Sequence, residues 1–126
     1  MARFFLCEKC GNLVGVIHSS GVPMVCCGQK MTELVPKSTD TGVEKHLPVV
    51  SVEGNVVRVN VGSVTHPMSE EHHIGWVYLE TERGGLRRVL APTDAPVAVF
   101  TLDEGERPIA AYAYCNLHGL WKTDIA

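Results

Sequence analysis

Four histidines and one cysteine in the last two-thirds of the chain lie in local contexts suited to metal binding: His46, His66, His72, Cys115 and His118. Cys115 and His118 have the spacing of half a metal knuckle. His66 precedes a proline, which favours an extended backbone, and a short loop returns the chain to His72. Four imidazoles and one thiolate leave one position of an octahedral metal open. The set therefore predicts a site that reacts with a small molecule and does not only hold the fold together.

Each of these residues also has a simpler interpretation. A single histidine in a β domain is more often a core or surface residue than a ligand, and His18 and His73 are interpreted in this way. Cys115 taken alone is a buried free thiol. His72 and His73 are adjacent, and composition does not choose between them.

The other four of the five cysteines lie in the first 27 residues, as Cys7, Cys10, Cys26 and Cys27. An odd cysteine count argues against a secreted disulfide framework. A segment of residues 1–36 is also too short to fold on its own core, since chains below roughly 40 residues usually need metals or disulfides. Four thiolates on one ion would supply that stability.

The adjacent pair Cys26-Cys27 requires a backbone turn, because neighbouring side chains of a strand point to opposite faces. Gly28 permits such a turn, and we expect a distorted tetrahedral site. Tetrahedral sulfur sites suit zinc and iron alike, so the residues leave both metals open. A catalytic dithiol is disfavoured because Cys7 and Cys10 lack a thioredoxin-like βαβ context.

The composition is that of a globular protein, with 126 residues, 45% hydrophobic and 20% charged. A net charge of -3 and a pI of about 6.0 argue against a nucleic-acid partner. No apolar run reaches the roughly 18 residues of a membrane span, and the start has no signal-peptide pattern. The sequence therefore predicts a cytoplasmic protein that binds neither nucleic acid nor membrane.

The chain is predicted to contain two domains, residues 1–36 and 37–126, with a polar linker at 36–42. No helical period is evident. Apolar and polar residues alternate at 57–61, and Ile74, Trp76 and Tyr78 are predicted to share one face of a strand. Residues 97–100 and 109–114 are further strand candidates. About seven short strands separated by turn residues predict an all-β fold. The second domain is therefore expected to be an immunoglobulin-like antiparallel β-sandwich.

Together these motifs resemble desulfoferrodoxin, the two-iron class of superoxide reductase, along the whole chain. The resemblance is carried by five motifs: Cys7-x-x-Cys10 with Cys26-Cys27, Glu44-Lys45-His46-x-Pro48, His66-Pro67-Met68, His72-x-Ile74-x-Trp76, and Cys115-Asn116-x-His118-Gly119-x-Trp121. It implies a small desulforedoxin-like metal-binding domain followed by the β-sandwich.

The resemblance implies two iron ions per chain. One is an Fe(Cys)4 centre on Cys7, Cys10, Cys26 and Cys27. The other is a non-haem Fe(His)4(Cys) centre with equatorial His46, His66, His72 and His118 and axial Cys115; the family register, His-x-Ile-x-Trp, selects His72 over His73. The resemblance also maps Glu44 to a sixth ligand of the oxidised site and Lys45 to the residue that assists superoxide. By themselves, Glu44 and Lys45 would be solvated surface residues.

The implied activity is the one-electron reduction of superoxide to hydrogen peroxide, an oxidoreductase reaction that detoxifies superoxide in an anaerobe or microaerophile. The resemblance further implies a homodimer and a rubredoxin-like electron donor. The alternative is a zinc ribbon joined to an immunoglobulin-like protein-binding module in which metal is only structural. A non-haem dioxygenase fits poorly, since those enzymes use a histidine-and-carboxylate facial set.

Overall fold

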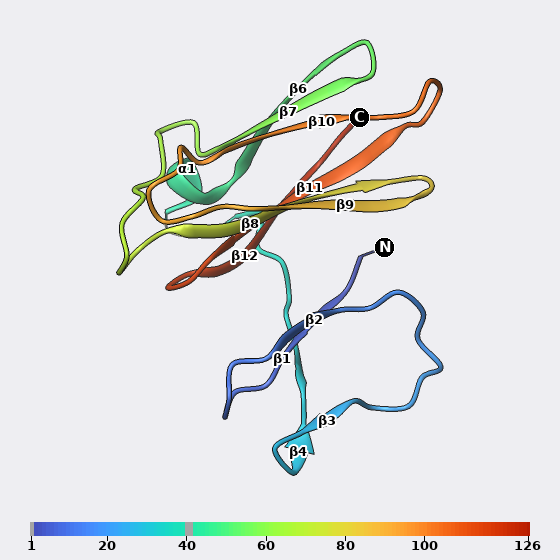
Figure 1. The fold of residues 1–126 in the computed structure, drawn as a ribbon, viewed down its shortest axis with the longest axis vertical. Helices are drawn as coiled ribbons and strands as arrows, with labels where there is room; N and C mark the ends of the chain where they lie inside the picture. The colour runs from blue at the N-terminus through green and yellow to red at the C-terminus, as the bar shows by residue number, and fades with distance from the viewer. Residues whose placement is uncertain (1, 40–41) are drawn as a thin grey trace. The chain divides into compact units, whose positions relative to one another are not determined.

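Strands make up most of the regular structure in the computed structural model, which describes residues 2–39 and 42–126. The chain divides into two compact units, Met1–Val35 and Pro36–Ala126. Figure 1 shows the chain coloured from blue at the N-terminus to red at the C-terminus.

The first unit contains five short strands and a small buried centre. Its strands are β1 (Phe4–Leu6), β2 (Leu13–Gly15), β3 (Val25–Cys26), β4 (Gln29–Lys30) and β5 (Thr32–Glu33). The antiparallel order β2-β1-β5 forms one sheet, and β3 and β4 form a separate hairpin. Phe4, Cys7 and Met31 are its buried apolar residues among those described. So small a core is consistent with a unit that needs a metal ion for stability.

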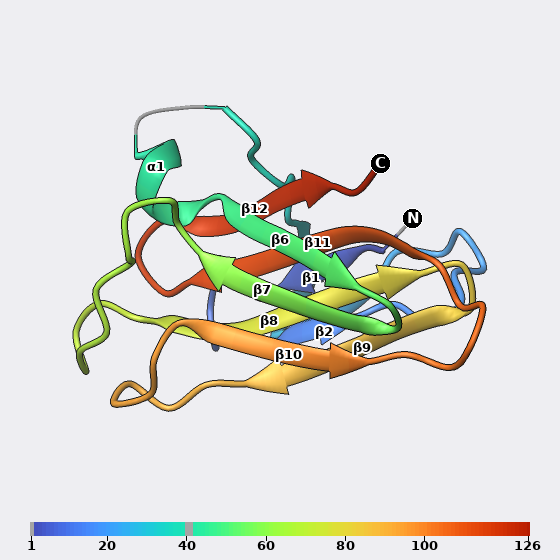
Figure 2. The ribbon, with the colours of Figure 1, turned by 90° about the horizontal axis from the view of Figure 1, so that it is seen from above.

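The second unit is a sandwich of two antiparallel sheets (Figure 2). Its strands are β6 (Pro48–Glu53), β7 (Val56–Val61), β8 (Ile74–Thr81), β9 (Gly84–Val89), β10 (Val97–Thr101), β11 (Pro108–Cys115) and β12 (Gly119–Asp124). One sheet has the order β10-β7-β6 and the other β12-β11-β8-β9. The first, second and fifth strands thus share a sheet, as in immunoglobulin-like sandwiches. The predicted all-β class and β-sandwich are confirmed.

The alternation of residue types explains the core between the two sheets. Val57, Val59 and Val61 of β7 are at most 1% exposed, while Arg58 and Asn60 between them face outward. The facing sheet contributes alternate residues of β8 and β11 to the same cluster, among them Val77, Leu79, Ala111, Ala113 and Cys115. Cys115 is therefore held at the edge of a well-packed core.

The prediction that Ile74 shares a face with Trp76 and Tyr78 is wrong. The pairing of β8 with β11 shifts register between Tyr114, which lies opposite Trp76, and Cys115, which lies opposite Ile74. This irregularity leaves Gly75 as an extra residue, so Ile74 turns inward and joins the core. The irregularity therefore lies at the start of β8, next to the loop that carries His72.

Two features of the connection between the units differ from expectation. The helix α1 (Val43–His46) is a single turn that follows Gly42, whose φ is 87°. One turn is too short to give a helical period in the sequence. The predicted linker at 36–42 also begins with structure, since Lys37 forms a parallel bridge with Trp121. Residues 40 and 41 of that linker lie outside the described residues.

In the part of the chain that the structure describes, no helix has the length and apolar character required to cross a membrane.

Candidate metal centres

The five candidate ligands of the second unit meet at one end of the sandwich. Figure 2 shows α1, the loop between β7 and β8, and the β11–β12 turn at this end. His46 is the last residue of α1, and His66 and His72 lie on the β7–β8 loop. Cys115 ends β11, and His118 lies in the turn before β12. Residues up to 72 positions apart in the sequence are thus brought together.

The four imidazole rings lie near the corners of a square. Taken in the order His46, His66, His72 and His118, neighbouring ring centroids are 4.7, 4.6 and 5.0 Å apart, and the distance from His118 back to His46 is 4.7 Å. The diagonal from His46 to His72 is 6.2 Å. Neighbouring rings are inclined by 71° to 80°. Four rings in this arrangement can direct one nitrogen each towards a common centre.

Hydrogen bonds of the other ring nitrogens fix which nitrogen faces that centre. The Nδ1 atom of His46 lies 2.8 Å from the Gly42 carbonyl oxygen, and that of His66 lies 2.7 Å from the Pro67 carbonyl oxygen. If each Nδ1–H donates, each Nε2 is left as an acceptor, the form that binds a metal. The Nε2 atoms of His66 and His72 are buried and have no hydrogen-bond partner among the described residues. A metal ion is the group that such atoms would satisfy.

Cys115 and His118 complete the cluster from the β11–β12 turn. The sulfur of Cys115 and one ring nitrogen each of His46, His66 and His72 all lie within 4.8 Å of one another. His118 places Nδ1 3.7 Å from the Cys115 sulfur and 3.1 Å from Nε2 of His46. Cys115 is fully buried, whereas His118 is exposed. One edge of the site is therefore open to solvent.

His73 is directed elsewhere. Its Nδ1 lies 2.9 Å from the carbonyl oxygen of Ser69, and its backbone N–H donates to Asn116 Oδ1. The structure thus brings His72 to the cluster and keeps His73 apart from it.

Burial lowers the pKa of three histidines of the cluster, His46, His66 and His72, and so favours their neutral form. Desolvation lowers the pKa of His66 from 6.5 to about 4. It also lowers the pKa of His46 and of His72, with smaller contributions from neighbouring cationic groups. Neutral imidazole is the form that binds a metal, so the site is prepared for a cation.

Trp121 on β12 and Lys37, which lies in the segment before α1, both contact the site. The indole of Trp121 stacks on His46 with centroids 4.8 Å apart and planes 17° apart. Its Nε1–H donates to the His118 carbonyl oxygen at 3.2 Å, and Lys37 Nζ donates to the same oxygen at 3.2 Å. Trp121 belongs to the motif that begins at Cys115. Lys37 lies in the segment that was interpreted as a linker, and nothing in the sequence marks it as part of a site.

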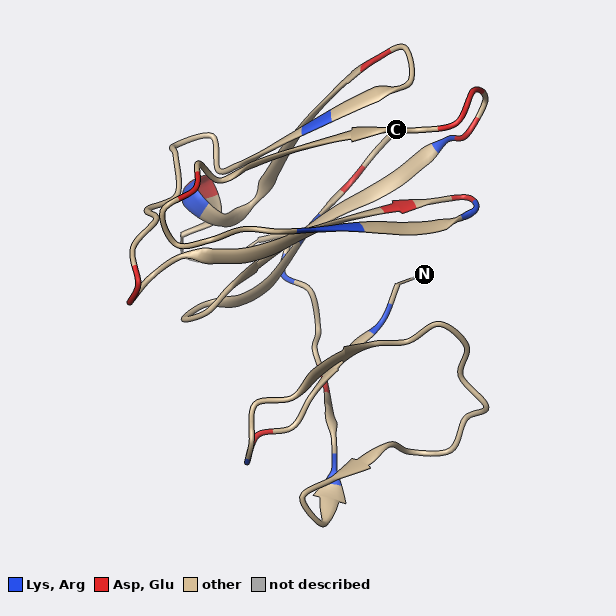
Figure 3. Cartoon of the chain, viewed as in Figure 1, with Lys and Arg blue, Asp and Glu red and all other residues tan. Residues whose placement is uncertain are grey.

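Figure 3 shows an acidic and a basic position on α1. These are Glu44 and Lys45, which precede His46 and are exposed. The ammonium of Lys45 contributes to the lowered pKa of His72, so its charge acts on the cluster. The Glu44 carbonyl oxygen accepts hydrogen bonds from the Val64 N–H at 2.9 Å and the Ser63 hydroxyl at 3.2 Å. These bonds hold α1 against the start of the loop that carries His66.

The second cluster is formed by the four cysteines of the first unit, whose sulfur atoms lie within 4.8 Å of one another. The sulfurs of Cys10 and Cys26 are 3.6 Å apart. A tetrahedron with metal–sulfur bonds of about 2.3 Å has edges of about 3.8 Å. The predicted turn is present, because both Cys27 and Gly28 have positive φ, 53° and 75°. This is the backbone of a tight two-residue hairpin turn between β3 and β4.

The environment favours the thiolate at Cys7, whereas hydrogen bonding with the Cys10 and Cys7 sulfurs raises the pKa of Cys26 and raises that of Cys27 to about 12. A hydrogen bond from the Cys10 backbone N–H lowers the pKa of Cys7 to about 6, against an opposing effect of desolvation. The Asn12 side-chain amide donates to the Cys26 sulfur at 3.6 Å. Thiolate is the form of cysteine that binds metal ions.

A fold of this kind with these two clusters defines a class of protein, an all-β protein with one tetrathiolate site and one site of four imidazoles and a thiolate. The Desulfoferrodoxin family model matches residues 38–124, and the model "Desulfoferrodoxin, N-terminal domain" matches residues 2–34. The chain therefore belongs to the desulfoferrodoxin family.

Individual relatives match nearly the whole chain. A desulfoferrodoxin homolog of Archaeoglobus fulgidus is 46% identical over 121 residues, which is 96% of this chain and 95% of that protein. Desulfoferrodoxin of Nitratidesulfovibrio vulgaris is 41% identical over 122 residues, 97% of this chain and 95% of that one. The crystal structure of the superoxide reductase from Treponema pallidum has a TM-score of 0.84 at 34% identity, covering 98% of both chains. The two clusters match the two-iron arrangement of desulfoferrodoxin.

Proposed function

We propose that this chain is a superoxide reductase that converts superoxide to hydrogen peroxide at an iron ion held by His46, His66, His72, His118 and Cys115. The observation that carries the proposal is the near-square of four imidazoles beside the buried Cys115 sulfur. That sulfur lies within 4.8 Å of a ring nitrogen of His46, His66 and His72 and 3.7 Å from Nδ1 of His118. The names of structural neighbours, such as the superoxide reductase of Treponema pallidum, support the same activity. An interaction module with structural metal only would not require this cluster.

The reaction takes one superoxide, one electron and two protons to one hydrogen peroxide. A bound ferrous ion supplies the electron and a residual positive charge that favours an anion. The chain supplies the neutral imidazoles, the thiolate and the open edge at exposed His118. Solvent at that edge provides the protons.

We assign the catalytic roles at the open edge to Lys45 and Glu44. The ammonium of Lys45 attracts superoxide, because it is exposed and its charge acts on His72. Glu44 precedes it on α1, and its carboxylate would serve as a further ligand when the iron is oxidised. If oxidised Glu44→Ala and the oxidised parent chain have the same absorption spectrum, Glu44 does not have this role.

We further propose that residues 1–36 form an Fe(Cys)4 domain on Cys7, Cys10, Cys26 and Cys27, and that residues 37–126 form the catalytic domain. Iron held by these four cysteines would store or relay an electron from a rubredoxin-like donor. Reduced rubredoxin should therefore bleach the oxidised chain in a stopped-flow experiment. Absence of any electron transfer would contradict this choice of donor.

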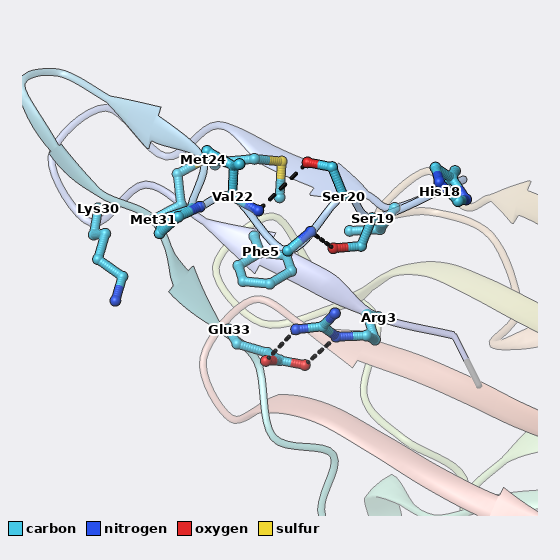
Figure 4. A pocket seen from close by; sticks show the side chains of 13 residues that line it. Arg3, Phe5, His18, Ser19, Ser20, Val22, Met24, Lys30, Met31 and Glu33 are labelled. Carbon is cyan, nitrogen blue, oxygen red and sulfur yellow. Dashed lines mark hydrogen bonds and ion pairs between the residues drawn. The ribbon is translucent and has the colours of Figure 1, made fainter.

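A homodimer is proposed from the surface of the first unit. A cavity of about 450 Å³ lies between the segment 16–24 and strands β1 and β5 (Figure 4). The Arg3–Glu33 ion pair forms one wall at 2.9 Å, and Ile17 nearby is fully exposed. A second copy of the chain would cover Ile17 and the apolar lining of the cavity, and it would compensate for the small core of the first unit. Sedimentation as a monomer at every concentration would contradict this pairing.

A cytoplasmic location is proposed because none of the five cysteines is paired in a disulfide, as is usual in a reducing compartment. Detection of the chain outside the cytoplasm by cell fractionation would contradict it.

Metal analysis of three chains tests the proposed centres. The parent chain should contain iron at both clusters, two ions per chain. Cys10→Ser should lose the first iron and keep superoxide consumption by the pre-reduced protein. Cys115→Ser should keep the first iron and lose that activity. Zinc at the cysteines with an empty histidine cluster in iron-replete protein would overturn the proposal.

A further inference from the structure

Asn116 joins two segments that each carry candidate ligands. It lies between Cys115 and His118 in the β11–β12 turn, and it makes three hydrogen bonds to Glu71 and His73, the residues on either side of His72. Its backbone N–H donates to the His73 carbonyl oxygen at 3.2 Å. Its side-chain Oδ1 accepts from the His73 N–H at 2.9 Å. Its Nδ2 donates to the Glu71 carbonyl oxygen at 2.9 Å.

The side chain of Asn116 imitates a strand partner where regular pairing has been interrupted. The β8–β11 ladder shifts register at Cys115, opposite Ile74. Beyond that point the carboxamide offers one acceptor and one donor to successive peptide groups, as a backbone would. Pairing therefore continues past the bulge and up to the residues that flank His72.

The segment that carries His72 needs such an attachment. Ser69, Glu70 and Glu71 are exposed, so few apolar contacts hold them. Ser69 and His72 form hydrogen bonds within the loop. The Ser69 N–H donates to the His72 carbonyl oxygen at 2.9 Å, and the Ser69 hydroxyl donates to the same oxygen and accepts from the His72 N–H, each at 3.2 Å. They do not connect it to the β11–β12 turn. Asn116 makes that connection.

We propose that Asn116 is a positioning residue that fixes the His72 loop against the Cys115–His118 turn and so sets the place of one imidazole relative to the thiolate. The inference rests on the proposed metal assignment of the cluster. Without these bonds, His72 would have to be ordered each time the site closes around a metal ion. Partners of this kind typically change metal affinity by about 10–100-fold.

Two substitutions and one matched control test the role of Asn116. Asn116→Ala removes both side-chain bonds, whereas Asn116→Asp keeps an acceptor for the His73 N–H and loses the donor to Glu71. Asn55→Ala is the control, because Asn55 Nδ2 donates to the Leu102 carbonyl oxygen at 3.0 Å in the turn after β6, at the opposite end of the sandwich. All three variants are made in the full chain.

The first readout is release of ferrous iron from the histidine cluster to a chelator. We expect release about 10–100-fold faster in Asn116→Ala, an intermediate rate in Asn116→Asp, and the parent rate in Asn55→Ala. The thiolate-to-iron absorption band of the oxidised site should shift in the Asn116 variants alone. Iron at the four cysteines should be released at the parent rate in every chain.

The second readout needs no metal. Amide hydrogen exchange of His73 in the metal-free chain should accelerate in Asn116→Ala and remain slow in Asn116→Asp. Parent-like exchange and iron release in Asn116→Ala would overturn the inference, as would equal acceleration by Asn55→Ala. A parent chain that takes no iron at the histidines would instead overturn the proposed function, and His73 exchange would still test the attachment. If the alanine variant does not fold, iron release from Asn116→Asp carries the test, and release at the parent rate would overturn the inference.

Discussion

The indole of Trp121 lies flat against the imidazole of His46, with ring centroids 4.8 Å apart, while its Nε1–H holds the carbonyl oxygen of His118 at 3.2 Å. One side chain thus contacts a candidate ligand on α1 and another in the β11–β12 turn. Trp121 is 1% exposed, so it belongs to the packed interior as well as to the site.

Two substitutions of Trp121 should therefore distinguish the contribution of ring packing to stability from that of the hydrogen bond. Trp121→Ala should lower the free energy of unfolding of the metal-free chain by about 3–5 kcal/mol. Trp121→Phe keeps a ring against His46 and loses the bond to His118, which is worth about 0.5–1.5 kcal/mol. Denaturant unfolding measures both changes. Equal losses in the two variants would show that the stacked ring does not stabilise the site.

Gly62 should be required for the close approach of the β7–β8 loop to α1. A Cβ added there would overlap the Val64 carbonyl oxygen and come within 2.6 Å of the Lys45 carbonyl oxygen. Gly105 is the matched control, because its φ of 80° resembles the 87° of Gly62 and nothing lies within 4 Å of an added Cβ. Each alanine should cost about 1–2 kcal/mol for the left-handed backbone.

Gly62→Ala should cost a further 1–3 kcal/mol or so, since the added methyl forces a backbone shift. It should also slow superoxide consumption by displacing Lys45 and His46, whereas Gly105→Ala should leave the rate unchanged. The same stability and rate in both variants would mean that the contact with α1 is not needed.

Lys45 should accelerate the encounter with superoxide. Steering by local positive charge raises association rates by about 10-fold or more and weakens as salt rises. Lys45→Ala should therefore lower the second-order rate constant at low ionic strength and flatten its dependence on salt. Lys122→Ala removes the same charge from β12, where the ammonium lies 3.1 Å from Asp124, and should leave both quantities close to the parent. Pulse radiolysis of the pre-reduced chains gives the rate constants.

The metal-free chain should lose stability as the pH falls from about 6.5 to about 4. Burial lowers the folded-state pKa of His66 from 6.5 to about 4, so the unfolded chain takes up this proton first. A shift of this size corresponds to about 3 kcal/mol once the pH is below both values. This destabilisation is absent when the pH is above the pKa of His66 in the unfolded chain, and it is complete when the pH is below the pKa of His66 in the folded chain.

Denaturant unfolding of the metal-free chain between pH 7 and pH 4 measures this loss. His66→Gln is neutral throughout that range, so its stability should depend less on pH. The same pH slope in parent and variant would show that His66 is not the group responsible.

Histidine and cysteine are chemically specific, so they could be named as candidate ligands from the sequence, but the full set of five around one ion came from the family resemblance, because these residues lie up to 72 positions apart. The residues alone left His72 and His73 as alternatives, and the structure separates them through the bond of His73 to Ser69. The turn at Cys27 and Gly28 was also predictable, since two adjacent cysteines can reach one ion only where the backbone reverses.

Other features depend on long-range packing and leave little trace in the sequence. Ile74 follows the alternation of Trp76 and Tyr78, and only the register shift opposite Cys115 turns it inward. Lys37 resembles any linker lysine until its ammonium is seen at the His118 carbonyl oxygen. The single turn of α1 is likewise too short for a periodic pattern.

Product analysis tests the central claim most directly. The ferrous chain, supplied with an electron donor, is mixed with superoxide while hydrogen peroxide and oxygen are both quantified. The account predicts one peroxide for each superoxide consumed and no oxygen from the catalysed reaction. Oxygen and peroxide in equal amounts, the proportions of a dismutase, would contradict it.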